Sequence, residues 1–119
     1  MLLKSNMFLI GLVIAANVIG QLMFKVAANQ VKNENTLQDM VIKLLTNPAA
    51  WGAVLLYALM VIAWIWVLRV LPLSLAYSSI ALVFVFVPLF GSILFNEPLS
   101  IKFFIGMTCI VAGVWLIHN

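Results

Sequence analysis

The first apolar run of the chain carries Asn17, Gln21 and Lys25, which are spaced four residues apart. In an α-helix such residues lie about 40° apart in turn, so they form one polar stripe along one face. Amide groups hydrogen-bond a polar ligand, and an ammonium group binds phosphate as a point charge. Polar groups inside a membrane span are costly and often functional, although Asn17 can also join helices and Lys25 can also anchor a helix end. We predict that the stripe contacts substrate, and that Gly20 beside it permits close helix packing.

Two aromatic residues are further candidates for a substrate-binding region. Trp64 lies deep in the second apolar run, and Tyr77 in the third carries a hydroxyl group that needs a partner. Either residue can line a pocket, and ordinary packing is the alternative role. Trp51 and Arg69 lie near the ends of the second run, which is typical of anchors at the membrane surface.

The sequence contains no set of residues typical of an active site or a metal centre. It has one histidine, His118, and one cysteine, Cys109, so neither a metal site nor an intrachain disulfide is expected. Ser74, Ser78 and Ser79 have no histidine near them in the sequence, and no glycine-rich phosphate loop precedes a helix. We therefore expect neither an enzyme nor a bound cofactor.

The composition places these residues in a membrane protein. Of the 119 residues, 66% are hydrophobic and 8% are charged, and the mean hydropathy is +1.25. A soluble domain is about half apolar and about one quarter charged, and so short a chain cannot bury this much apolar surface. The basic residues behind the net charge of +3 lie at the ends of apolar runs rather than on one face. Membrane lipids are thus the expected surroundings, and no nucleic-acid partner is expected.

The uncharged runs predict four membrane-spanning helices in a single all-α membrane domain. Each span needs about 20 residues, and backbone groups in lipid must be satisfied by helical hydrogen bonds when the alternation of barrel strands is absent. The predicted helices comprise about residues 7–26, 49–71, 73–95 and 101–118.

Very short turns join the last three predicted helices. Asn47 before Pro48, and Ser100, are typical helix N-caps. Pro72 falls in the short turn between the second and third helices, so we expect the last three helices to pack as antiparallel neighbours. Pro88 lies inside the third helix and is expected to kink it.

The connection at about residues 27–47 predicts a short amphipathic helix at the membrane interface. Thr36 and Asp39 fit a capping box, and Asp39 and Lys43 form a favourable i, i+4 pair. The apolar face follows helical spacing and comprises Leu37, Met40, Val41, Leu44 and Leu45.

Topology and assembly are weakly encoded. Lysines 25, 32, 43 and 102 fall on one side of the membrane, against Lys4 and Arg69 on the other, which favours the first and third loops in the cytoplasm. Gly106 and Gly113 lie seven residues apart on one face of the fourth helix, where small residues allow close packing in lipid. Because four helices enclose little space, we predict a dimer with this face at its interface.

Two stretches of the chain resemble the small multidrug resistance transporters. They are ANVIGQLMFK in the first helix and IGMTCIVAGVWLI in the fourth, including the glycine pair. The family comprises four-helix antiparallel dimers that exchange protons for cations through a glutamate in the first helix. Asn17 occupies that position here, and an asparagine cannot bind and release a proton near neutral pH. The resemblance therefore does not imply proton-coupled drug export.

A closer resemblance covers nearly the whole chain. It is carried by GQLMFKVA, WIWVLRVLPLSLAYSS, LFNEPLS and GMTCIVAGVWLI, which resemble small single-repeat members of the drug/metabolite transporter superfamily. Among these are paired flippase subunits for undecaprenyl-phosphate-linked aminoarabinose, used in lipid A modification. The resemblance implies a multi-pass protein of the bacterial inner membrane that carries a lipid-linked sugar phosphate, as a homodimer or as a heterodimer with a related small subunit.

The residues are compatible with that role and leave alternatives open. Lys25 or Lys102 can meet the phosphate, and Glu97 can pair with an amino sugar, pair with Lys102 or serve as a turn carboxylate. A cation exporter working without an acid in the first helix is one alternative function. A non-transporting accessory subunit of another membrane protein is the second.

Overall fold

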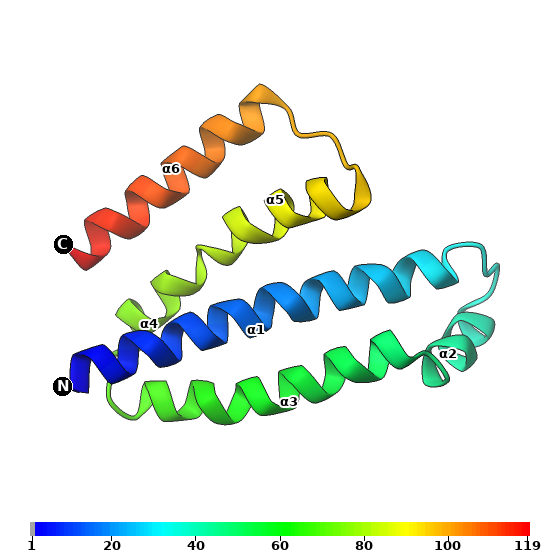
Figure 1. Cartoon of the computed structure of the whole chain (residues 1–119), viewed down its shortest axis with the longest axis horizontal. Coiled ribbons are helices and arrows are strands. Elements are labelled where there is room, and N and C mark those ends of the chain that lie inside the picture. Colours follow the sequence, from blue (N-terminus) through cyan, green and yellow to red (C-terminus); the bar gives the residue numbers. More distant parts are fainter. Residues whose placement is uncertain (1) are drawn as a thin grey trace.

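A computed structural model describes residues 2–119, which form six α-helices and, within that range, no strand (Figure 1). The helices are α1 (Leu2–Val31), α2 (Leu37–Leu45), α3 (Pro48–Leu68), α4 (Leu73–Ile80), α5 (Val83–Phe95) and α6 (Ile101–His118). Four segments are long and apolar enough to cross a membrane, namely Lys4–Val31, Pro48–Leu68, Leu73–Phe95 and Ile101–His118. The predicted all-α fold with four spans is confirmed.

The long helix α1 lies at the centre of the arrangement, between α3 on one side and α5 on the other (Figure 1). Helix α6 packs against α4 and α5. The start of α1 and the end of α6 lie at one end of the bundle, and α2 lies at the other end with the α5–α6 connection (Figure 1). The segments that carry Lys25, Lys32, Lys43 and Lys102 therefore share one end.

The expectation that the last three spans pack as successive neighbours is wrong for the second and third. Helix α3 meets the third span at their short connection, but α1 separates α3 from α5 (Figure 1). Gly20 on α1 allows α3 to approach one face closely. On the α5 side, Gly11 and Ala15 of α1 and Phe86 of α5 line a shared pocket, and a Cβ at Gly11 would meet no atom within 4 Å, so this contact is looser.

Three helix ends differ from the sequence-based boundaries. Helix α1 begins at Leu2 and ends at Val31 rather than spanning 7–26, because charges mark where a helix leaves the membrane and not where its hydrogen bonds stop. Helix α3 ends at Leu68 rather than at residue 71, since the residue before Pro72 is disfavoured in helical geometry.

The third span is interrupted at Ala81–Leu82, whereas Pro88 lies inside α5, which is continuous from Val83 to Phe95. The kink expected at Pro88 stays a prediction. Around the break the backbone uses i→i−3 bonds, including Ala81 N to Ser78 O (3.1 Å) and Leu82 N to Ser79 O (3.2 Å). The hydroxyls of Ser78 and Ser79 both donate to the Leu75 carbonyl. Such back-bonding competes with the backbone and bends helices.

The three predicted N-caps are confirmed, and of the predicted capping box the bond accepted by Thr36 is present. Thr36 Oγ1 accepts from Asp39 N at 3.2 Å, Asn47 Oδ1 accepts from Ala49 N at 2.9 Å, and Ser100 Oγ accepts from Phe103 N at 3.2 Å. The amide of Asn47 also donates to Gln30, which ties the end of α1 to the start of α3.

The predicted short helix between the first two spans is present as α2, with one pairing corrected. Lys43 Nζ lies 3.0 Å from Glu34 Oε1 rather than pairing with Asp39, because the turn before α2 brings the less exposed Glu34 carboxylate back over the helix. The location of α2 at the membrane interface stays a prediction.

Little of the apolar surface is buried within one subunit. The buried apolar side chains are Val13, Val18, Ala27, Val31, Ala53, Val67, Ala76, Val83 and Met107. The last span, Ile101–His118, is the least covered, with 6% of its most apolar stretch buried against 11–17% for the other three. Lipid or another subunit must cover the remaining apolar faces.

Candidate functional site

The predicted polar stripe comprises Asn17, Gln21 and Lys25. Asn17 and Gln21 are joined to α3 by Tyr57. Gln21 Nε2 donates to the Tyr57 hydroxyl at 2.8 Å, and that hydroxyl donates to Asn17 Oδ1 at 3.2 Å. The ring of Phe24 stacks on the Tyr57 ring with 5.4 Å between centroids. The middle of the stripe therefore meets a hydroxyl and an aromatic surface.

Tyr57 is the site residue that the sequence-based selection missed. It was open to the same reasoning that singled out Tyr77, since both are phenol groups within apolar runs. Tyr57 lies near the middle of Pro48–Leu68, and its depth in that span is the signal that could have identified it.

The third stripe residue, Lys25, forms an ion pair with Glu97. Lys25 Nζ lies 3.2 Å from Glu97 Oε1, and the two side chains are 46% and 50% exposed. The expected pairing of Glu97 with Lys102 is therefore replaced by a pairing with Lys25, and the pairing of Glu97 with an amino sugar stays a prediction. Within residues 2–119, Lys102 forms no ion pair.

The turn after α5 explains why Glu97 reaches α1. Asn96 has φ 54°, a left-handed conformation that asparagine tolerates better than most residues and that reverses the chain at the helix end. The Glu97 carboxylate then lies over Gly91, where an added Cβ would be 3.7 Å from Oε2. The position of Glu97 is thus set by the backbone of the turn.

The depth of the stripe follows from helix geometry. Asn17 and Lys25 are eight residues apart, which corresponds to about 12 Å along the axis. The hydrocarbon core of a bilayer is about 30 Å thick. A span centred on Asn17 would therefore hold Lys25 and its partner Glu97 near the edge of the hydrocarbon.

The structure does not connect the other two predicted binding residues to the stripe by hydrogen bonds. Trp64 is half-buried on α3, seven residues beyond Tyr57 toward the opposite end of the bundle. Tyr77 is 66% exposed on α4. Across residues 2–119 neither side chain has a hydrogen-bond partner in the chain. Their roles in binding stay predictions.

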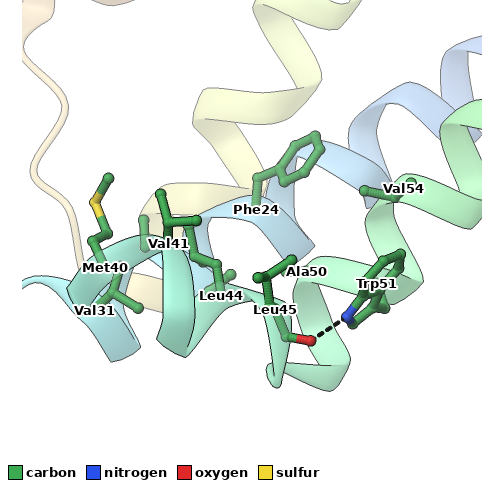
Figure 2. Close-up of a pocket in the computed structure, with 11 residues that line it drawn as sticks. Phe24, Val31, Met40, Val41, Leu44, Leu45, Ala50, Trp51 and Val54 are labelled. Carbon is green, nitrogen blue, oxygen red and sulfur yellow. Dashed lines mark hydrogen bonds between the residues drawn. The ribbon is translucent and has the colours of Figure 1, made fainter. Parts of the chain in front are cut away.

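An apolar groove of about 410 Å³ lies beside the stripe, between α1, α2 and α3 (Figure 2). Phe24 lines this groove and also stacks on Tyr57. The indole N–H of Trp51 is already bonded to the Leu45 carbonyl at 2.6 Å (Figure 2). The rest of the lining comprises Ala27, Ala28, Val31, Met40, Val41, Leu44, Ala50 and Val54. Hydrocarbon is the chemistry that fits this lining.

The tertiary structure brings Ser79 and His118 together, although no histidine lies near this serine in the sequence. Ser79 Oγ lies 2.8 Å from His118 Nε2, and His118 Nδ1 lies 2.9 Å from the Val114 carbonyl. Ser79 is buried. No carboxylate among the described residues contacts the imidazole, so the pair joins α4 to α6 without forming a catalytic triad.

The remaining predictions concern metals and the subunit interface. Residues 2–119 hold no group of three or more His, Cys, Asp or Glu side chains that could bind a metal ion. A Cβ added at Gly106 or Gly113 would meet no atom within 4 Å. That face of α6 is open within one subunit, and its role as a dimer interface stays a prediction.

Comparison with known proteins identifies flippase subunits as relatives. The chain is 45% identical over 64 residues to the probable 4-amino-4-deoxy-L-arabinose-phosphoundecaprenol flippase subunit ArnE of Serratia proteamaculans, covering 54% of this chain and 56% of that protein. It is 35% identical over 107 residues to the probable ArnE subunit of Sodalis glossinidius, covering 90% and 88%. It is 43% identical over 65 residues to the probable ArnF subunit of Proteus mirabilis, covering 53% and 49%. No family model and no solved structure matches.

Proposed function

Since the chain belongs to the family of 4-amino-4-deoxy-L-arabinose-phosphoundecaprenol flippase subunits, we propose that it moves a polyprenyl-phosphate-linked amino sugar across the membrane. The observation that carries the proposal is the stripe on α1, which ends in a half-exposed Lys25. The family and the four spans make this a multi-pass protein of the bacterial inner membrane. Transport rather than catalysis is part of the proposal.

The head group of such a lipid needs polar partners on its way through hydrocarbon. Burying a polar group without hydrogen bonds costs about 2–7 kcal/mol. Lys25 supplies a cation for the phosphate near the membrane edge. Deeper in the membrane, Gln21, Tyr57 and Asn17 hold hydrogen bonds with one another that they can exchange for bonds to sugar hydroxyls. The stripe therefore offers a stepwise polar path over about half of the membrane.

The polyprenyl chain needs no such path, because it can remain in lipid while the head group crosses. The apolar groove beneath α2 offers a place for its first isoprene units. Phe24 connects that groove to the stripe, so a head group at Lys25 and a chain in the groove fit a single lipid molecule.

A second subunit completes the path in this proposal. One stripe on one face of α1 forms only part of a channel wall, and α6 is largely uncovered. Relatives include proteins named as ArnE and as ArnF subunits. We therefore propose a dimer in which the face with Gly106 and Gly113 lies between subunits, either two copies or one copy with a related small subunit.

The test is reconstitution of the chain in vesicles, alone and with an ArnF-type subunit. The vesicles contain a short-chain polyprenyl-phosphate aminoarabinose, and a membrane-impermeant amine reagent reports how much lipid remains in the outer leaflet. We expect the accessible fraction to change faster than in protein-free vesicles, with Lys25→Ala slower than the parent. Absence of lipid movement in both assemblies would contradict the proposal.

A further inference from the structure

Glu97 is the carboxylate that faces the polar stripe. The chain has three carboxylate side chains, Glu34, Asp39 and Glu97. Glu34 is paired with Lys43, and Asp39 belongs to the first turn of α2. Glu97 instead lies 3.2 Å from Lys25, on the connection between α5 and α6.

We propose that Glu97 determines specificity by binding the protonated amine of the sugar while Lys25 binds the phosphate. This inference rests on the proposed function and adds the residue that distinguishes an amino sugar from a hydroxyl sugar. On binding, the Lys25–Glu97 ion pair exchanges for two ion pairs with the head group. No covalent bond changes and no proton moves.

Charge balance supports the exchange. A phosphodiester linking sugar and polyprenol carries one negative charge, and the protonated amine carries one positive charge. The ion pair is neutral, the head group is neutral, and so is their complex. Net charge therefore does not accumulate at the edge of the hydrocarbon, where an unpaired charge is costly.

The geometry permits the two side chains to separate. Each is about half exposed within one subunit, so neither side chain is enclosed by the rest of the chain. The backbone at Glu97 stays in place because Asn96 fixes the turn and Gly91 lies beneath the carboxylate. The site is thus accessible, and its two opposite charges stand on separate segments.

A sugar with a hydroxyl in place of the amine forms an ion pair with only one of the two charged side chains. Its phosphate takes Lys25 and leaves Glu97 without a cation. An amino sugar satisfies both groups, and hydrogen bonds between charged groups are about twice as strong as neutral ones. We expect the parent protein to prefer the amino lipid by about tenfold or more, the effect of one charge-assisted contact.

The experiment compares binding of two short-chain lipids to purified protein, one polyprenyl-phosphate aminoarabinose and one polyprenyl-phosphate arabinose. The variants are Glu97→Gln and, as a matched control, Glu34→Gln, which breaks the other ion pair at the same end of the bundle. We expect the Glu97→Gln variant to bind the amino lipid with about tenfold lower affinity than the parent. We expect it to bind the hydroxyl lipid as well as or better than the parent. Glu34→Gln should keep the parental preference.

A charge swap, Lys25→Glu with Glu97→Lys, separates recognition from structural support. If the ion pair has only a structural role, the swap restores that role and with it the affinity for the lipid. We instead expect the swapped protein to bind the amino lipid weakly, because each charge then faces the group of like charge on the head group. The inference is overturned if Glu97→Gln lowers the affinity for both lipids equally, or if this variant keeps the parental preference for the amino lipid. A parent protein that binds both lipids equally overturns it alone, whereas a parent that binds neither overturns the proposed function as well.

Discussion

Gly20 of α1 lies against the ring of Tyr57 of α3, so closely that a Cβ at residue 20 would be 2.5 Å from Tyr57 Cε2 and 3.1 Å from Cδ2. The absent side chain lets the two helices approach, as small residues do in membrane proteins. It also places the Tyr57 hydroxyl between Gln21 and Asn17. Packing and polar chemistry are therefore coupled at this crossing.

Gly20→Ala should move Tyr57 and loosen the contact between α1 and α3. The added methyl group overlaps an aromatic ring that stacks on Phe24, and overpacking of this kind costs about 1–3 kcal/mol. Unfolding by SDS in mixed micelles measures the change in the free energy of unfolding. Gly11→Ala is the control, because a Cβ there meets no atom within 4 Å. Equal stability of the two variants would argue against the close contact.

Lys25→Ala should weaken binding of a polyprenyl-phosphate sugar by roughly tenfold to a hundredfold, the value of a contact of about 1.5–3 kcal/mol. Lys25→Arg keeps the charge and should retain much of the affinity. Binding is measured on purified, correctly inserted protein, with Lys102→Ala as the matched loss of a lysine at the same end. If Lys25→Ala binds like the parent, Lys25 is an anchor, and Lys102 or Arg69 becomes the candidate for the phosphate.

Quaternary cations should not drive proton movement through this protein. Asn17 accepts a hydrogen bond from Tyr57 at 3.2 Å and has no proton to exchange near neutral pH. A pH-sensitive dye inside proteoliposomes measures the flux after a cation is added under a pH gradient. Flux above that of protein-free vesicles would favour the cation exporter over the flippase.

Gly113→Leu should reduce the amount of dimer. Since a Cβ at this residue meets no atom within 4 Å of its own subunit, we expect the leucine to disturb mainly a partner packed against that face. Cross-linking in native membranes measures the dimer, and Gly11→Leu is the control at another open glycine. An undiminished dimer in Gly113→Leu places the interface elsewhere.

The sequence by itself determined the features that depend on local interactions. Hydropathy marked the four spans because lipid requires long apolar helices. Thr36, Asn47 and Ser100 predicted helix starts because an N-cap satisfies amides two or three residues away. Spacing of four placed Asn17, Gln21 and Lys25 on one face, which needs only helix geometry.

The tertiary structure alone decided which partners those residues meet. Glu97 reaches Lys25 rather than Lys102 because the left-handed turn at Asn96 directs it toward α1. Tyr57 rather than Tyr77 joins the stripe because α1 packs against α3 at Gly20. These pairings depend on how each helix is rotated and which neighbour it meets, and both follow from packing between segments far apart in the sequence, which helical periodicity does not encode.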